Sequence, residues 1–377
     1  MEDDVIFPAM CKSIFKMKKD VNEMSKESKE MQARIKELTH SKQKTKEILQ
    51  KLSDMILPYK GTSCPMQSLE VIMNIEDLHS HCSLCPIELS DKRIATGSLD
   101  GSISICSIDL TAKTWKQEIK KKNAHNNSIY SLCEFPNNQL VSSSEDTTII
   151  IWQISQKALT QLHQITGHTK AVNKVININQ NYFASCSADN TVKIWSHNDN
   201  YKEIVSLEHK SPVCSIISLS TKPVLVSSSA GMSDSVMFWD LRTYKLISSV
   251  REVCANKPTH MIELRNGCVA LTSKNDFEMY NNFIIIIETI TYTIVKRITR
   301  RGRILHYSSL CNWDDSSFVY IYEGNFLHIS TTDYKILYER IIKLDDFGFY
   351  GIILINNEYL LLTNRSYGFN IIKPCLE

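Results

Sequence analysis

One short segment of this chain occurs three times. Residues 142–154 read SSSEDTTIIIWQI, the same pattern returns 43 residues later as SCSADNTVKIWSH, and a third version, SSSAGMSDSVMFWDL, ends at residue 241. Each copy runs from small polar residues through an Asp to an apolar run that ends near a Trp. This pattern predicts strands joined by a tight turn, within a unit of roughly 40–45 residues. Such a unit cannot bury its apolar faces alone, so several copies must pack together.

Residues outside the copies strengthen the pattern. Aligning the Asp-to-Trp segments pairs Asp100 with Cys106, Asp146 with Trp152, Asp189 with Trp195 and, slightly shifted, Asp234 with Trp239. A His stands upstream of three of them, at positions 125, 168 and 209. The chain therefore resembles the WD-repeat β-propellers, whose units carry a Gly-His before the innermost strand and a Trp-Asp at the end of the third strand.

The resemblance implies a buried hydrogen-bonded tetrad in two of the units. In each, the turn Asp accepts from the His imidazole, the His reaches a Ser, and the Ser reaches the Trp indole. One predicted tetrad is His125, Ser142 or Ser144, Asp146 and Trp152. The other is His168, Ser185 or Ser187, Asp189 and Trp195. Because buried polar groups are costly unless they are hydrogen-bonded, we expect these residues to stabilise the fold and not to perform chemistry.

The strand rhythm continues to the end of the chain although the motif fades. Counting from residue 82 gives units that start near residues 82, 128, 171, 212, 259, 304 and 348, and the last has only three strands of its own. Residues 68–78 have strand character and are expected to supply the missing outer strand, which closes the ring. The predicted fold is an all-β seven-bladed WD-repeat β-propeller over residues 64–377.

The amino-terminal segment has a different pattern. Thirteen positions at alternating steps of three and four lead from Ile14 to Ile56, and ten of them are apolar; the segment has no Gly or Pro, and Pro58 follows. This spacing predicts a coiled-coil helix over residues 10–58 that makes the protein a homo-oligomer. A single solvated helix is the alternative. Residues 12–60 hold 13 Lys/Arg against 7 Asp/Glu, but because the two signs are interleaved, the segment gives no strong signal for nucleic acid or a membrane surface.

Composition places the chain among globular proteins. Its 377 residues are 43% hydrophobic and 22% charged, with a net charge of +2. The 12 Cys show no framework spacing and most stand in apolar runs, which predicts reduced thiols in a cytoplasmic protein, with the nucleus as a second possibility. The longest uninterrupted apolar run, residues 283–287, is too short to span a membrane.

One group of residues has the spacing of a zinc site. Cys82 and Cys85 form a C-x-x-C pair, with His79, His81 and Cys64 nearby. However, aligning CSLC at 82–85 with YSLC at 130–133 places Cys85 in an innermost strand, so the sequence favours a core thiol. The same alignment leaves the first blade without its His, with Asp77 near that position. No catalytic or cofactor motif stands in the chain, so we expect no cofactor, no metal and no enzyme activity.

The expected binding surface is the narrow face of the ring, where the loops into the innermost strands meet the turns between the second and third strands. In blades two to four this face should carry Asn127, Glu145, Lys170, Lys174, Ala188, Lys210 and Ser211. Such a rim suits an acidic or phosphorylated peptide, although scattered lysines also occur on any solvated rim. The sequence favours a non-catalytic scaffold that presents a peptide-binding propeller. The alternatives are a substrate-recruiting subunit of a ubiquitin ligase and a phosphoinositide-binding propeller.

Overall fold

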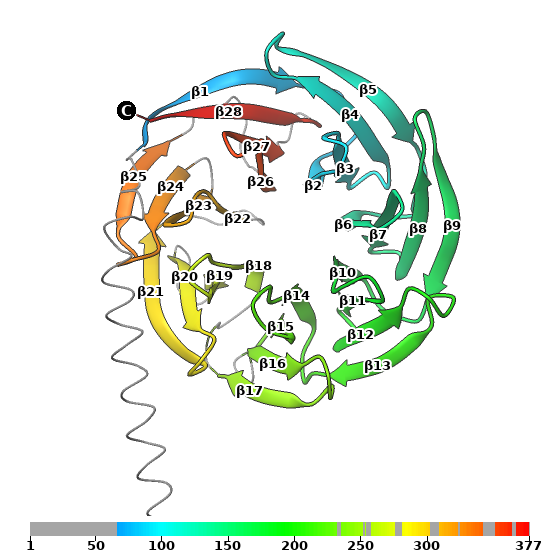
Figure 1. The fold of residues 1–377 in the computed structure, drawn as a ribbon, viewed down its shortest axis with the longest axis vertical. Coiled ribbons are helices and arrows are strands. Elements are labelled where there is room, and N and C mark those ends of the chain that lie inside the picture. The colour runs from blue at the N-terminus through cyan, green and yellow to red at the C-terminus, as the bar shows by residue number, and fades with distance from the viewer. Residues whose placement is uncertain are drawn as a thin grey trace, which may run out of the picture. The chain divides into compact units, whose positions relative to one another are not determined.

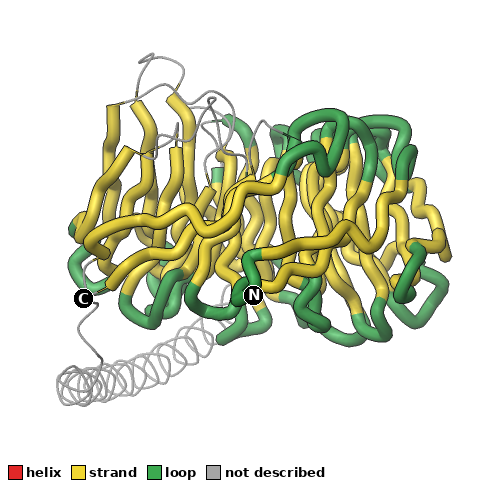
Figure 2. Tube along the Cα trace, turned by 90° about the horizontal axis from the view of Figure 1, so that it is seen from above, coloured by secondary structure: helices red, strands yellow, loops and turns green. Residues whose placement is uncertain are grey.

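The structure is a computed structural model that describes residues 66–231, 235–251, 253, 258–275, 281–301, 309–322, 325–341, 351–363 and 367–376. The predicted coiled coil at residues 10–58 lies outside the described residues. The described residues form seven antiparallel sheets of four strands each, arranged as the blades of a ring (Figure 1). Seen from the side, the strands run between two faces on which the loops lie (Figure 2). Among the described residues, no helix has the length and hydropathy needed to cross a membrane.

Each of the first four blades is built from consecutive strands, from the channel outward. Blade 1 contains β2 (Ser83–Glu88), β3 (Ile94–Ser98), β4 (Ile103–Asp109) and β5 (Thr114–Lys121). Blade 2 contains β6 (Ile129–Phe135), β7 (Gln139–Ser144), β8 (Thr148–Ile154) and β9 (Leu159–Thr166). Blade 3 contains β10 (Val172–Asn177), β11 (Tyr182–Ser187), β12 (Thr191–Ser196) and β13 (Glu203–Glu208). Blade 4 contains β14 (Val213–Ser218), β15 (Val224–Ser229), β16 (Val236–Asp240) and β17 (Leu246–Val250).

The remaining blades keep the same order until the ring closes. Blade 5 contains β18 (Pro258–Glu263), β19 (Cys268–Asn275), β20 (Asn281–Glu288) and β21 (Thr293–Arg301). Blade 6 contains β22 (Ser309–Asn312), β23 (Ser317–Tyr322), β24 (Asn325–Ser330) and β25 (Ile336–Ile341). Blade 7 contains β26 (Ile352–Ile355), β27 (Tyr359–Thr363), β28 (Phe369–Leu376) and, on its outside, β1 (Met66–Ile75).

The ring is closed by strands from the two ends of the described chain. The strand expected at residues 68–78 is β1, which runs antiparallel to β28 from Met66 opposite Leu376 to Ile75 opposite Phe369. The two strands lie side by side along the rim in Figure 1. Because every other blade is made from consecutive strands, this one pairing joins the first and last described strands and covers the edge of β28.

The apolar core is divided among the spaces between blades. Seven buried clusters each draw residues from two neighbouring blades; the cluster between blades 1 and 2, for example, includes Ile105 and Trp152, both at most 1% exposed. The alternation of apolar and small residues along the strands supplies both faces of each sheet. A blade is therefore stable only between its neighbours, and the ring is held as one body.

Candidate functional site

Two sets of loops meet on one face of the ring. The turn between the second and third strands of a blade bonds to the connection that enters its innermost strand: Glu145 N donates to Ser128 O at 2.9 Å and Ala188 N to Ala171 O at 2.9 Å. We call this face, in blades 1 to 4, the narrow face. It comprises residues 76–82 with 99–102, 122–128 with 145–147, 167–171 with 188–190, and 209–212 with 230–231.

The structure brings together the four residues of the tetrad predicted in blade 2. Asp146 Oδ2 lies 3.0 Å from His125 Nδ1, and His125 Nε2 lies 2.7 Å from Ser142 Oγ. Trp152 Nε1 donates to the same hydroxyl at 2.8 Å. The other candidate serine, Ser144, instead donates to the backbone of the entering loop, at 3.2 Å from Asn127 O. The tetrad thus ties two loops and two strands of one blade together.

The tetrad of blade 3 has the same geometry. His168 lies 2.8 Å from Asp189 and 2.7 Å from Ser185, and Trp195 donates to Ser185 at 2.8 Å. Burial alone would raise the pKa of Asp189, but hydrogen bonds from Thr191, Thr169 and His168 outweigh it and lower the pKa to about 2. The carboxylate is therefore charged near neutral pH.

This Asp–His–Ser order is also the order that activates a serine nucleophile in hydrolases. Here the serine cannot act in that way, because Ser142 and Ser185 are completely buried and each hydroxyl already accepts an indole N–H. A nucleophile must reach a substrate, so these groups serve structure.

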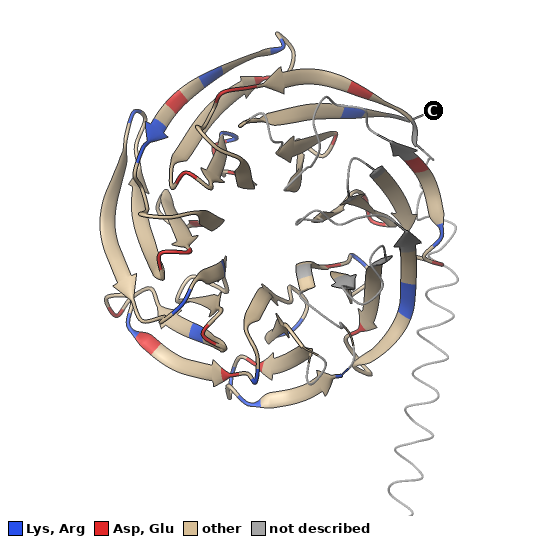
Figure 3. Ribbon diagram, turned by 180° about the vertical axis from the view of Figure 1, so that it is seen from behind, with Lys and Arg blue, Asp and Glu red and all other residues tan. Residues whose placement is uncertain are grey.

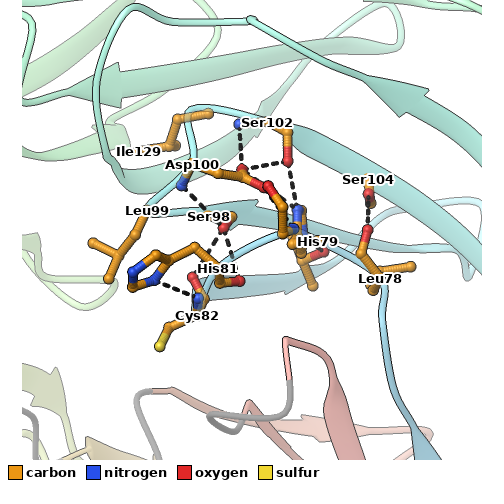
Figure 4. Close-up of polar contacts among 12 residues, drawn as sticks. Leu78, His79, His81, Cys82, Ser98, Leu99, Asp100, Ser102, Ser104 and Ile129 are labelled. Atoms are coloured by element: carbon orange, nitrogen blue, oxygen red, sulfur yellow. Dashed lines mark hydrogen bonds and ion pairs between the residues drawn. The ribbon is translucent and has the colours of Figure 1, made fainter.

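Blade 1 corrects the expectation that it has no His. His79 occupies the position of His125, with its Nε2 2.9 Å from Thr96 Oγ1. Its Nδ1 lies 2.7 Å from Ser102 Oγ (Figure 4). Asp100 is 4.0 Å from Nδ1 and accepts from Ser80 and Ser102 instead. Burial lowers the pKa of His79 to about 4, so the imidazole is neutral near pH 7. The prediction that put Asp77 near this place was wrong.

The reason for the error is a shift of two residues in the alignment. In the ladder of β2 and β3, Cys85 lies opposite Gly97, which is the place of Ser131 opposite Ser143 and not of Cys133. Cys85 does lie in an innermost strand, and burial raises its pKa to about 12. Among the described residues, no three His, Cys, Asp or Glu side chains are arranged to hold a metal ion; Cys64 lies outside them.

Blade 4 contains a network that the predicted site residues did not include. His209 Nε2 lies 2.8 Å from Ser227 Oγ, and Trp239 Nε1 donates to that hydroxyl at 2.9 Å. Asp234, which the alignment paired with Trp239, lies outside the described residues. The signal for blade 1 was available in the sequence, because Asp100 follows His79 at the same spacing of 21 residues that separates His125 from Asp146.

The predicted rim residues divide into two groups. Asn127, Glu145, Lys170 and Lys210 are exposed on the narrow face, and Ala188 and Ser211 are half-buried there. Lys174 is not on the rim: it lies inside β10, half-buried, with its Nζ 3.4 Å from Ser215 Oγ of blade 4. The prediction for Lys174 was wrong because β10 begins two residues earlier, at Val172.

Charge is spread evenly over the ring. Acidic and basic residues of the described strands and turns alternate around it without gathering on one side (Figure 3). Among the described residues, the basic groups are therefore not concentrated as they are on a surface that binds a polyanion such as nucleic acid.

Comparisons with known proteins agree with the geometry. The family described as WD domain, G-beta repeat matches residues 116–153 and 159–196, which end at the Trp-containing strands of blades 2 and 3. The crystal structure of the WD40 beta propeller domain of Doa1 superposes with a TM-score of 0.63 at 15% sequence identity, covering 83% of this chain and 98% of that one. At this identity the likeness shows the fold alone.

Relatives found by sequence are matched over part of their length. Nuclear distribution protein nudF of Aspergillus flavus is 33% identical over 111 residues, which are 28% of this chain and 23% of that protein. Autophagy-related protein 16 of Arabidopsis thaliana is 27% identical over 187 residues, which are 48% of this chain and 35% of that protein. This chain thus spans no more than about a third of either relative.

Proposed function

Because this chain carries WD40 repeats and folds as a WD-repeat β-propeller, a fold that serves protein–protein interaction, we propose that it is a non-catalytic scaffold whose narrow face binds a peptide. The observation that carries the proposal is the set of histidine networks in blades 1 to 4. Each network fixes a loop of the narrow face against its own blade, so Asn127, Glu145, Lys170 and Lys210 are displayed on a rigid frame. Rigid loops lose little conformational entropy when a ligand binds.

The second part of the proposal concerns the oligomeric state. A coiled coil over residues 10–58 would join two or three rings, so that weak contacts of single rings become avid. The support for it is the heptad spacing of the sequence. Light scattering on the full chain and on residues 66–377 tests it: we expect a dimer or trimer and a monomer, respectively. A monomeric full chain would refute the oligomer and leave the binding face untouched.

The binding face is tested by paired charge reversals. A protein captured by the isolated ring is first identified and purified, and its affinity is then measured for Glu145→Lys and Lys170→Glu. The matched controls are Lys157→Glu and Asp199→Lys, which change exposed residues in the loops of the opposite face. We expect the narrow-face variants to bind at least about tenfold more weakly and the controls within about twofold. Equal losses in both sets would overturn the assignment of the face.

The same experiment separates the alternatives. If the purified partner is a ubiquitin ligase subunit, the chain recruits substrates for that ligase. If the ring binds phosphoinositide vesicles and this binding is lost on changing blade lysines, the lipid-binding alternative replaces the peptide.

A further inference from the structure

The outer edge of blade 4 differs from the edges of the other blades. Its outermost strand, β17, lies on the rim of the ring (Figure 1), and no other described strand pairs with its outer side. Edge strands can pair with other chains, and proteins commonly protect them with charged residues. Among the seven outer strands, only β9 and β17 contain no Lys, Arg, Asp or Glu. Because β9 carries Gln and His side chains, β17 is the edge with the least protection.

β17 also exposes two consecutive apolar side chains. Leu246 is 48% exposed and Ile247 is 42% exposed, whereas each other outer strand has at most one exposed large apolar residue among those described. A β-bulge explains this arrangement, since Leu246 and Ser248 lie opposite consecutive residues of β16 and Ile247 is the extra residue between them. A bulge interrupts the regular alternation of side chains between the two faces of a strand. β17 thus combines an apolar surface with an edge that no described strand covers.

Basic residues stand at both ends of β17. Arg242 and Lys245 precede it and Arg251 follows it, and all three are exposed. Among the described residues, neither Arg242 nor Lys245 forms an ion pair. The carboxylate of Asp240 lies in the same turn, but it accepts the backbone N–H groups of Arg242 and Thr243, at 2.7 and 3.2 Å. The charge that this edge offers to a ligand is therefore positive.

Blade 5 adds the same two kinds of group beside blade 4. The exposed Arg297 donates to Val253 O at 3.4 Å, just beyond the end of β17. The ring of Tyr292 lies 4.8 Å from the ring of Phe238 in β16. Ile290, two residues before that Tyr, is 74% exposed, more than any other large apolar residue that the structure describes. The edge of β17 is therefore apolar with a basic border.

A second copy of this chain does not suit this edge. In an antiparallel pairing of two copies centred on Ser248, Lys245 would lie opposite Arg251. In an in-register parallel pairing, each basic residue would lie opposite its own copy. Like charges directly opposite one another destabilise a pair of strands. A strand with acidic residues at its ends and apolar residues between them matches both the charges and the exposed side chains.

We propose that β17 accepts an added strand from a partner protein, in the form of an extended segment with apolar residues at alternate positions and an acidic residue at each end. Backbone hydrogen bonds to the edge supply affinity. Contacts with Leu246 and Ile247, together with the basic border, supply specificity. This site lies on the rim, apart from the narrow face, so the inference goes beyond the proposed function and does not depend on it.

The test uses fluorescent seven-residue peptide libraries on the full chain. Valine is fixed at alternate positions, the positions between are varied among uncharged polar residues, and both ends are Glu in one library and Lys in the other. We expect the Glu-ended library to bind about tenfold more tightly than the Lys-ended one. Methylation of alternate backbone nitrogens should abolish binding, because it removes the donors of a strand pair. Hydrogen exchange should slow on binding in residues 246–250 and not in residues 203–208.

Matched variants locate the bound peptide. Ile247→Asn and Lys245→Glu should each weaken binding of the Glu-ended library by about tenfold or more. The controls Ile204→Asn and Lys202→Glu change the equivalent residues of blade 3, where Ile204 is also the extra residue of a bulge and is also 42% exposed. Both controls should bind as the parent does. If Ile247→Asn does not fold, Ile247→Thr takes its place.

Several results would overturn this inference. One is a Glu-ended library that does not bind, or that binds every variant equally. Loss of binding in Lys170→Glu but not in Ile247→Asn would place the peptide on the narrow face and support the proposed function instead. A changed oligomeric state of Ile247→Asn in light scattering would assign the edge to a second copy. Binding to phosphatidylserine vesicles that is lost in Lys245→Glu would assign it to a lipid surface.

Discussion

The imidazole Nε2 of His79 lies 2.9 Å from the Thr96 hydroxyl, across the same 17 residues that separate His125 from Ser142 and His168 from Ser185. Blade 1 thus keeps the histidine bond although Thr replaces the Ser and Cys106 replaces the Trp. The retained bond, from His79 to Thr96, fixes the loop to the strand. The missing bond, from the Trp indole to the Ser hydroxyl in the other blades, would join the second and third strands, which their backbone ladder already holds together. Loop fixation is therefore the common property of these networks.

Ser142→Ala should destabilise the ring far more than the neighbouring Ser143→Ala. The first change leaves the buried His125 Nε2 and Trp152 Nε1 without their shared partner, which costs about 2–4 kcal/mol. Ser143 Oγ is buried without a hydrogen-bond partner, so its removal should be neutral or slightly stabilising. Urea unfolding of the two variants measures both effects, and equal losses would contradict the tetrad as a stabilising unit.

Stability should decrease between pH 7 and pH 5 because of buried histidines. Burial lowers the pKa of His79 and of His209 to about 4, whereas an unfolded His titrates near 6.5. Below pH 6.5 these histidines become protonated in the unfolded chain but stay neutral in the folded chain. Their contribution to the free energy of unfolding is therefore full above pH 6.5 and is lost as the pH falls toward 4. Each of the two residues should cost on the order of 2 kcal/mol by pH 5.

The histidine contribution can be isolated with His79→Gln. This variant should be less stable than the parent at pH 7, and its loss between pH 7 and pH 5 should be smaller by about 2 kcal/mol. The tetrad carboxylate of Asp189, with a pKa of about 2, does not interfere in this window, because its contribution is lost only below about pH 4, the pKa of an unfolded Asp. An unchanged pH dependence would mean that His79 is not held neutral.

Substitutions at Gly101 and at Thr147, the equivalent turn position of blade 2, should change stability in opposite directions. Gly101 has φ +73° and a Cβ there would meet His125 O at 2.5 Å, so Gly101→Ala should cost about 1–3 kcal/mol. Thr147 has φ 74° at the equivalent turn of blade 2, where blade 3 has Asn190. Thr147→Asn should stabilise by about 0.5–1 kcal/mol, because Asn adopts this conformation more readily. Thermal unfolding measures both variants; a destabilised Thr147→Asn would show that the threonine makes a compensating contact.

Two truncations test how the ring is closed. Residues 66–377 retain β1 and should unfold cooperatively as a monomer. Residues 76–377 lack β1, which uncovers β28 and removes the buried Met73 and Ile75, at a cost of at least about 3 kcal/mol from these two side chains. Size-exclusion chromatography and thermal unfolding should show a destabilised or self-associating shorter chain. Similar behaviour of both chains would mean that closure by β1 contributes little.

Much of the blade structure follows from signals that are local in the chain. Ser142, Asp146 and Trp152 lie within ten residues of one another, and a strand, a turn and a strand need no distant partner to be recognised. Closure between β1 and β28 was also predictable, because one strand was missing from the count. His79 was missed although its spacing to Asp100 was in the sequence, since Thr96 and Cys106 removed the rest of the motif. The coiled coil over residues 10–58 remains a prediction.

The amino-acid sequence by itself determined the repeating unit, the number of units and the residues of two tetrads, because each depends on spacing along one short piece of chain. Only the tertiary structure decided which side chains face a neighbouring blade. Lys174 was expected on the rim from its place in the sequence, yet packing of blade 3 against blade 4 turns its ammonium group toward Ser215 of the neighbouring blade. Ser215 stands 41 positions further along the chain, and only the packing of one blade against the next brings the two side chains together.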